Sequence, residues 1–284
     1  MFEYVEKIEN ADLKNYCTFK IGARGTILFP KNLANLKKVI KDCENSHLPY
    51  FILGNGSNLL FPDHDLKSVL ISLKKFDKIK ILRSTSTGAK VYVEAGTNLF
   101  SLHNFCALNS LTGLEWSYGI PASFGGLIYM NGGAYGSEIA NFVLRVKVLS
   151  GGKVRWLRRK DINFQHRKSN IDGIILGAEI KLTNGEKNEI LKLQKQYLEN
   201  RKHSQPLDKP SAGSVFKRNK LLPAKIIDEF SLKGSKIGGA EISQKHAGFI
   251  VNIGGAKSAD VRALISFIKQ KTGINFEEEI IILE

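Results

Sequence analysis

Two glycine-rich segments, residues 119–126 and 131–136, lie close together in the middle of the chain. They restrict the fold strongly, because a packed core is built from side chains and glycine has none. Glycine permits tight turns, and it also lets backbone N–H groups approach a flat or anionic ligand. Two such segments so near each other are hard to explain by turns alone. We therefore expect residues 119–136 to contact a ligand.

A third glycine-rich segment, residues 54–58, follows a short apolar run at 49–53 that is typical of a buried strand. Ser57 and Asn58 would add hydrogen-bond donors to it. It is not the dinucleotide fingerprint, because Leu59 stands where the third glycine belongs. A tight turn and a phosphate-binding loop both remain open for this segment.

Apolar periodicity predicts an α/β arrangement in the N-terminal part of the chain. The spacing predicts a helix at 33–43 and another at 98–108 with Asn98 as its cap. A hairpin is expected at 145–159 around the Gly151-Gly152 turn. Further strands are predicted at 49–53, 69–73, 78–82, 90–94 and 174–182.

A charged helix at 186–201 ends before Pro206 and is predicted to connect two domains. Beyond it we expect helices at 223–230 and 259–271, the latter capped by Ser258 and ended by Gly273. Strands are expected at 248–252 and 279–283. The predicted organisation is a domain at 1–183 with two subdomains divided near residue 85, a connecting helix at 184–202 and a C-terminal domain at 203–284.

The formal net charge of +15 suits nucleic acids, smaller anions such as nucleotides, or simply a lysine-rich genome. The basic residues are spread along the chain without a nucleic-acid-binding motif, so we expect no nucleic-acid partner. Cys17, Cys43 and Cys106 lack metal-ligand spacing, and no metal is expected. Without a signal peptide or a membrane span, the protein is expected to be soluble and cytoplasmic.

Three further positions have both a structural and a functional interpretation. Residues 211–218 combine hydroxyls with two basic residues, which is also typical of a helix N-cap or a turn. His246 precedes an apolar strand, where a structural histidine is more common than a catalytic one. Arg167 alone is typical of a solvated surface arginine.

Taken together, these segments resemble the UDP-N-acetylenolpyruvoylglucosamine reductase family, in order and over nearly the whole chain. The matching segments are Asn15, residues 18–22, 52–60, 119–121, 130–131, 133–136, 205–206, 211–217 and 245–252. Departures from the usual family pattern occur at Ala122, Phe124, Gly132, Ser137, His166 and Arg218.

The resemblance implies an α+β fold, in which a two-subdomain α/β FAD-binding domain of the vanillyl-alcohol-oxidase type precedes a C-terminal α/β substrate lobe. It implies FAD and NADPH as cofactors. We expect the flavin to be noncovalent, because neither glycine-rich loop contains a histidine or cysteine that could form a link to it. The implied reaction is reduction of UDP-N-acetylglucosamine enolpyruvate to UDP-N-acetylmuramate in peptidoglycan synthesis, which serves cell wall biogenesis, cell shape and cell division. The chain length is similar to the compact subtype that lacks a tyrosine-bearing loop over the substrate.

The resemblance also assigns roles to individual residues. Arg167 would stabilise the enolate, Ser214 would protonate it, and Glu279 matches the C-terminal catalytic glutamate. Arg201, Lys217 and Arg218 would bind the UDP pyrophosphate. The FAD-binding residues would be Gly54, Asn55, Gly56, Ser57, Asn58, Gly119, Ile120, Pro121, Ser123, Asn131, Ala134 and Tyr135.

Two other functions remain open at this point. One is another FAD-dependent oxidoreductase of the same fold, such as an alcohol oxidase. The other is a basic nucleic-acid-binding protein without enzymatic activity. The oligomeric state is not predicted.

Overall fold

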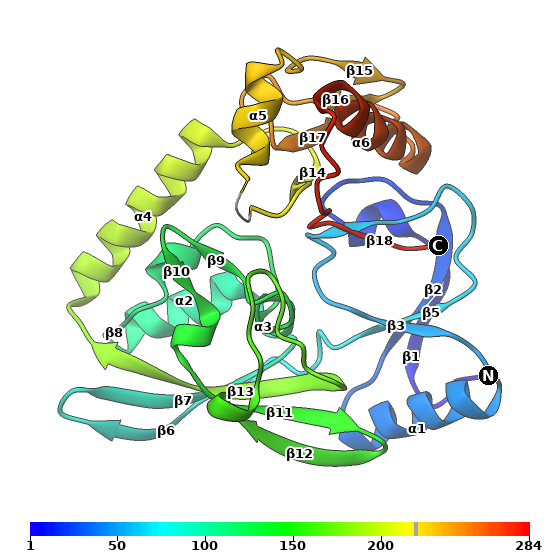
Figure 1. The fold of residues 1–284 in the computed structure, drawn as a ribbon. Coiled ribbons are helices and arrows are strands. Elements are labelled where there is room, and N and C mark those ends of the chain that lie inside the picture. The colour runs from blue at the N-terminus through cyan, green and yellow to red at the C-terminus, as the bar shows by residue number, and fades with distance from the viewer. Residues whose placement is uncertain (219–220) are drawn as a thin grey trace. The chain divides into compact units, whose positions relative to one another are not determined.

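The structure is a computed structural model that describes residues 1–218 and 221–284 (Figure 1). The chain forms two compact units, each assembled from separate stretches of sequence. The first unit comprises residues 1–7, 28–54 and 70–200, and the second comprises residues 8–27, 55–69 and 201–284.

The helices agree closely with the apolar periodicity of the sequence. Asn32 and Asn98 cap the first two α-helices through side-chain oxygens that accept backbone N–H bonds. The α-helices are α1 (Leu33–Asn45), α2 (Leu99–Leu108), α3 (Phe124–Tyr129), α4 (Lys187–Ser204), α5 (Pro223–Glu229) and α6 (Ser258–Thr272). The 3-10 helices are η1 (Leu13–Tyr16), η2 (Glu115–Ser117), η3 (Ile139–Asn141) and η4 (Arg159–Asp161).

A largely antiparallel sheet in the first unit has the order β12-β11-β13-β7-β6, with β8 also paired to β13. The predicted hairpin at 145–159 forms two of these strands, β11 and β12, around its glycine turn. β13 is buried along most of its length, and α3 packs against it and β7. The strands are β6 (Ile79–Thr85), β7 (Gly88–Glu94), β8 (Leu111–Thr112), β11 (Val143–Ser150), β12 (Lys153–Arg158) and β13 (Ile174–Asn184).

Another four-stranded sheet follows the order β1-β2-β5-β3. Its strands are β1 (Glu6–Asp12), β2 (Arg24–Phe29), β3 (Tyr50–Leu53) and β5 (Val69–Ser72). A short hairpin in the first unit joins β9 (Gly133–Ala134) and β10 (Ser137–Glu138).

In the second unit, β14-β17-β16-β15 form a sheet, and β18 pairs in parallel with β4. These strands are β4 (Leu59–Leu60), β14 (Ser211–Ser214), β15 (Lys236–Ile237), β16 (Ala240–Ile242), β17 (Phe249–Asn252) and β18 (Ile281–Ile282). The last strand is shorter than the predicted 279–283.

The predicted cap of α6 is wrong. Lys257, and not Ser258, occupies the N-cap position, and Gly273 ends the helix in the left-handed conformation as expected. The carboxylate of Asp63 accepts hydrogen bonds from the N–H groups of Ser258 and Ala259, at 2.7 and 2.9 Å. A carboxylate from a distant part of the sequence therefore satisfies the first turn.

Candidate active site

Gly54 and Ser123 lie side by side in the first unit and bring two of the glycine-rich segments together. A Cβ atom on Gly54 would lie 2.7 Å from the Ser123 hydroxyl oxygen. That hydroxyl also accepts a hydrogen bond from Gly126 N–H at 3.2 Å, which caps α3. Position 54 therefore requires glycine, and the start of the 54–58 segment converges with the 119–123 segment.

Close packing within the protein explains two glycines of the 131–136 segment. A Cβ on Gly133 would lie 2.5 Å from the Ser137 carbonyl oxygen, and one on Gly132 would lie 2.5 Å from a methyl of Leu127. A Cβ on Gly136, which has φ 78°, would meet no atom within 4 Å. Protein packing therefore explains glycine at positions 132 and 133, whereas the space beside Gly136 is open.

Arg167 occupies a tight turn in which Gln165 and Lys168 exchange backbone hydrogen bonds of 2.8 and 3.1 Å. Its φ of 57° lies in the left-handed region, where a residue with a side chain is strained by about 1–3 kcal/mol. The guanidinium Nη1 donates a hydrogen bond to the Gly133 carbonyl at 2.8 Å. The fold thus holds this arginine in a costly conformation, which is common at functional sites.

The same β9–β10 hairpin carries Ala134 and Tyr135, two of the predicted FAD-binding residues. Tyr135 packs on Tyr197 of α4, with ring centroids 4.6 Å apart. The hairpin therefore connects the Arg167 side chain to the predicted flavin-lining residues within the first unit.

Ser214 ends β14 in the second unit, opposite Phe249 of β17. The pairing is irregular between Ser211 and Ser214, where Gly213 has φ 79°. Such irregularities redirect side chains and are common beside active sites. Ser214 is half-buried, and none of the residues that the structure describes forms a hydrogen bond with its hydroxyl.

Glu279 lies beside the Ser214 segment, because its N–H donates a 2.7 Å hydrogen bond to the Val215 carbonyl. The Glu279 carbonyl accepts a 2.9 Å hydrogen bond from Nδ2 of Asn58, a predicted FAD-binding residue. The second unit thus brings together a predicted proton donor, the predicted catalytic glutamate and one residue of the 54–58 segment.

The two glutamates before Glu279 are used in ion pairs. Glu277 pairs with Lys217 and Glu278 pairs with Lys269, each with a nitrogen–oxygen distance of 2.5 Å. Three consecutive glutamates leave the register open in the sequence, and Glu279 is the one whose N–H bonds to Val215, next to Ser214.

The predicted substrate-binding cations differ in exposure. Arg201 is buried in the last turn of α4, Lys217 is mostly buried beside Glu277, and Arg218 is exposed. All three belong to the second unit, as do Ser214 and Glu279. Arg167 belongs to the first unit.

His246 has the structural role that its sequence position suggests. Its Nδ1 accepts a hydrogen bond from Gly248 N–H at 3.1 Å, and burial lowers its pKa. The Gly248 carbonyl in turn accepts a 2.9 Å bond from Val215 N–H. The neutral imidazole therefore supports the backbone that carries Ser214.

Asn252 is a structural residue that the sequence did not single out. Its Nδ2 donates to the carbonyls of Phe19 and Lys20 at 3.2 and 3.3 Å, and its Oδ1 accepts from Gly254 and Ala256. These bonds join segments 233 residues apart. No local pattern could reveal them, because the partners are backbone groups.

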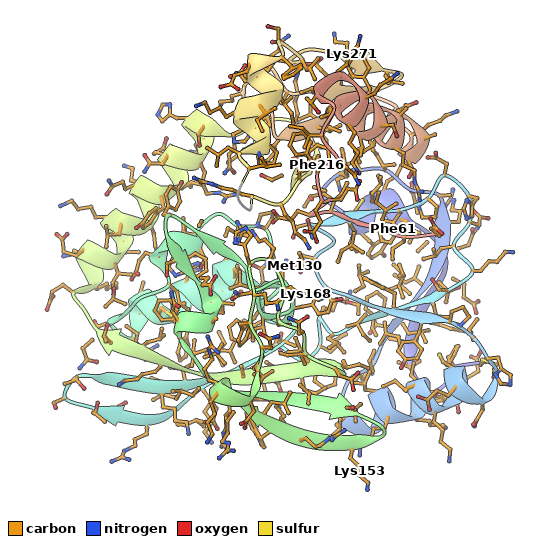
Figure 2. All side chains as sticks on the ribbon, viewed as in Figure 1. Phe61, Met130, Lys153, Lys168, Phe216 and Lys271 are labelled. Atoms are coloured by element: carbon orange, nitrogen blue, oxygen red, sulfur yellow. The ribbon has the colours of Figure 1, made fainter. Side chains whose placement is uncertain are left out.

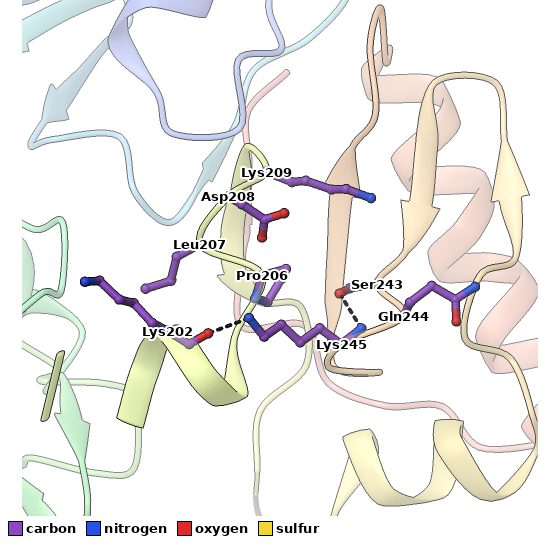
Figure 3. Close-up of a pocket in the computed structure, with 8 residues that line it drawn as sticks. All are labelled: Lys202, Pro206, Leu207, Asp208, Lys209, Ser243, Gln244 and Lys245. Atoms are coloured by element: carbon purple, nitrogen blue, oxygen red, sulfur yellow. Dashed lines mark hydrogen bonds between the residues drawn. The ribbon is translucent and has the colours of Figure 1, made fainter. Parts of the chain in front are cut away.

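A pocket of about 350 Å³ opens on the second unit (Figure 3). Lys245 spans one side of it and donates to the backbone carbonyl of Lys202, at the C-terminal end of α4. None of the predicted site residues lines this pocket. Its lining residues are Lys202, Pro206, Leu207, Asp208, Lys209, Ser243, Gln244 and Lys245.

Comparisons with known proteins first define the class. Residues 25–158, which include Gly54 and Ser123, match the model of an FAD-binding domain. A solvent-stable cholesterol oxidase shares this fold with a TM-score of 0.54 at 15% identity, over 64% of this chain and 38% of that chain. The chain is thus a flavoprotein with an α+β fold of the vanillyl-alcohol-oxidase type, as predicted.

Full-length relatives define the family. Residues 205–283 match the C-terminal domain model of UDP-N-acetylenolpyruvoylglucosamine reductase. The reductase of Thermotoga maritima is 42% identical over 94% of this chain and 95% of its own length, and that of Clostridium novyi is 38% identical over 97% and 90%. The crystal structure of the Thermus caldophilus reductase superposes with a TM-score of 0.83 at 32% identity, covering 99% of both chains. The chain belongs to the UDP-N-acetylenolpyruvoylglucosamine reductase family.

Proposed function

We propose that this protein reduces UDP-N-acetylglucosamine enolpyruvate to UDP-N-acetylmuramate with NADPH, for peptidoglycan synthesis. The observation that carries the proposal is the similarity to reductases of this name over nearly the full length of both chains. The convergence of Gly54 with Ser123 supports it, because loops with little side-chain bulk suit FAD. The cholesterol oxidase of this fold is similar to only 64% of the chain, at 15% identity.

FAD, when bound, supplies two-electron transfer from NADPH to the double bond of the substrate. The residues proposed to hold it are those of the 54–58 and 119–123 segments, with Ala134 and Tyr135 on the flavin side. Addition of hydride to the methylene carbon of the enol ether leaves negative charge on the adjacent carbon and its carboxylate. The chain must then stabilise this enolate and protonate it.

Arg167 is proposed to stabilise the enolate. A guanidinium offers a planar set of donors that matches a carboxylate, and the Gly133 carbonyl holds one of its nitrogens in place. Ser214 is proposed to protonate the enolate carbon. A hydroxyl is a weak acid, but a strongly basic enolate makes the transfer feasible. Glu279, held beside Ser214 through Val215, is proposed as the third catalytic residue.

Arg201, Lys217 and Arg218 are proposed to bind the UDP pyrophosphate. Lys217 would have to exchange its ion pair with Glu277 for the phosphate, which a strongly charged diphosphate makes feasible. Within residues 1–218 and 221–284, no helix is long and apolar enough to cross a lipid bilayer. We place the activity in the cytoplasm, where NADPH and UDP-sugars are available.

NADPH oxidation with and without UDP-N-acetylglucosamine enolpyruvate tests the function. We expect oxidation to depend on the enolpyruvyl compound, with UDP-N-acetylmuramate, two hydrogens heavier, identified by mass spectrometry. UDP-N-acetylglucosamine, which lacks the double bond, is the matched control. Equal rates with both compounds would reject the proposal.

A further inference from the structure

Asn131 is one of the most buried polar residues of the first unit, and protein partners occupy both ends of its side-chain amide. Nδ2 donates to the Gln165 carbonyl at 3.0 Å, and Oδ1 accepts from Ala140 N–H at 3.3 Å. Only 1% of the residue is exposed, and its φ is 42°. A buried amide with satisfied partners at both ends fixes its surroundings strongly.

The Gln165 carbonyl is the acceptor that closes the Arg167 turn. It receives the Lys168 N–H at 3.1 Å as well as the Asn131 amide at 3.0 Å. A carbonyl oxygen has two lone pairs, and here both are used. Asn131 therefore attaches the turn to the rest of the first unit at the point where the turn begins.

A second bond attaches the other side of the same turn. Ser169 N–H donates to the Tyr129 carbonyl at 3.0 Å, and Figure 2 shows the neighbouring residues Met130 and Lys168 near each other. Segment 129–131 thus holds the Arg167 turn at two points. A turn held this way can keep Arg167 in its left-handed conformation, which such a residue would otherwise leave.

We infer that Asn131 is a positioning residue that acts through Arg167, and that its side chain does not bind flavin. This inference rests on the proposed function, in which Arg167 stabilises the enolate. It replaces the expectation that Asn131 lines the flavin, because the amide that would contact the flavin is bonded within the protein. An arginine displaced by about 1 Å loses much of its benefit to a transition state, up to about 10²-fold.

Asn131→Gly tests the inference, since glycine tolerates the positive φ and removes only the side chain. We expect oxidation of the reduced flavin by the enolpyruvyl substrate to slow by about 10- to 100-fold. Flavin reduction by NADPH and FAD affinity should stay within about threefold of the wild type, as they do not need Arg167. Loss of FAD affinity, or equal slowing of both half-reactions, would overturn the inference in favour of flavin binding.

A double-mutant cycle separates a positioning role from a general structural one. If Asn131 acts through Arg167, Asn131→Gly combined with Arg167→Lys should be about as slow as Arg167→Lys alone. Asn184 is the matched control, because its Nδ2 also donates to a backbone carbonyl in the first unit, that of Ser86 at 2.9 Å. Asn184→Ala should leave both half-reactions unchanged and add nothing to Arg167→Lys. Additive effects of Asn131→Gly and Arg167→Lys would contradict the inference.

Asn131→Ala is the second variant, for use if the glycine variant does not fold. It keeps a Cβ and removes the amide donor to Gln165 and the acceptor for Ala140, so it should be as slow as the glycine variant. Wild-type oxidation rates would show that the Gln165 bond is not needed and would overturn the inference.

Amide hydrogen exchange gives a readout that does not depend on activity. Peptides covering residues 163–169 should exchange faster in Asn131→Gly and not in Asn184→Ala. Unchanged exchange would show that Asn131 does not hold the turn. If the wild type shows no substrate-dependent NADPH oxidation, the proposed function fails, while exchange still reports on the turn.

Discussion

The N–H of Glu279 donates a 2.7 Å hydrogen bond to the carbonyl oxygen of Val215, which places the glutamate beside the residue that follows Ser214. The two proposed catalytic residues of the second unit are therefore held by one backbone pairing, although 65 positions separate them in the sequence. This pairing makes the role of each side chain testable without disturbing the backbone.

Ser214→Ala should slow oxidation of reduced flavin by the enolpyruvyl substrate by about 10²–10⁴-fold, the range typical of a lost general acid. Flavin reduction by NADPH should remain nearly normal, because it requires no proton on the substrate. Loss of one half-buried hydroxyl should change the free energy of unfolding by only about 1 kcal/mol. Stopped-flow measurement of the two half-reactions tests whether Ser214 is the proton donor. An unchanged rate of flavin oxidation would show that it is not.

Glu279→Gln should reduce turnover sharply, whereas Glu278→Gln should not. Glu278 forms a partly exposed ion pair with Lys269, and pairs of this kind contribute only about 0–1 kcal/mol. Steady-state kinetics of the two variants compare adjacent positions with the same chemical change. The opposite result would shift the catalytic register by one residue.

Arg167→Lys should lower turnover strongly while the fold is retained. Lysine keeps the charge but loses the planar guanidinium, which bonds to the Gly133 carbonyl and leaves other donors for the substrate. Circular dichroism and thermal unfolding provide the structural control. Near-native turnover would exclude Arg167 from the proposed site.

The flavin should be noncovalent. Neither the 54–58 nor the 119–136 segment contains a histidine or cysteine that could form a covalent link, and the three cysteines of the chain are buried. Acid precipitation should release the yellow colour into the supernatant. Flavin that stays on the denatured polypeptide would contradict this prediction.

Acid should destabilise the protein partly through His103. Burial lowers the pKa of this imidazole to about 4, and its Nε2 lies 3.0 Å from the Ser117 hydroxyl. Because the folded-state pKa is below the unfolded value, the stability from the neutral ring is present above pH 6.5 and is lost as the pH falls toward 4. The loss should reach about 3 kcal/mol.

Urea unfolding at pH 7 and pH 4.5 measures this dependence. His103→Gln, which cannot be protonated, should show a smaller loss of stability between the two pH values than the wild type. His47→Gln, at an exposed histidine, is the matched control and should behave like the wild type. Equal losses in all three proteins would show that His103 does not contribute.

The sequence alone predicted elements whose causes are local. Apolar spacing and an asparagine cap define α1 and α2, and a Gly-Gly turn between alternating strands defines the β11–β12 hairpin. The ordered motifs also indicated the family and its FAD-binding fold, because a motif is readable without knowledge of its partners.

Only the tertiary structure showed which distant groups meet. Asp63 accepts hydrogen bonds from the first turn of α6, Asn58 bonds to the Glu279 carbonyl across 221 positions, and Asn131 bonds to the Arg167 turn. Each of these bonds joins a side chain to a backbone group far along the chain. A backbone N–H or carbonyl is the same at nearly every residue, so the sequence does not mark the partner, and the topology of the chain decides it.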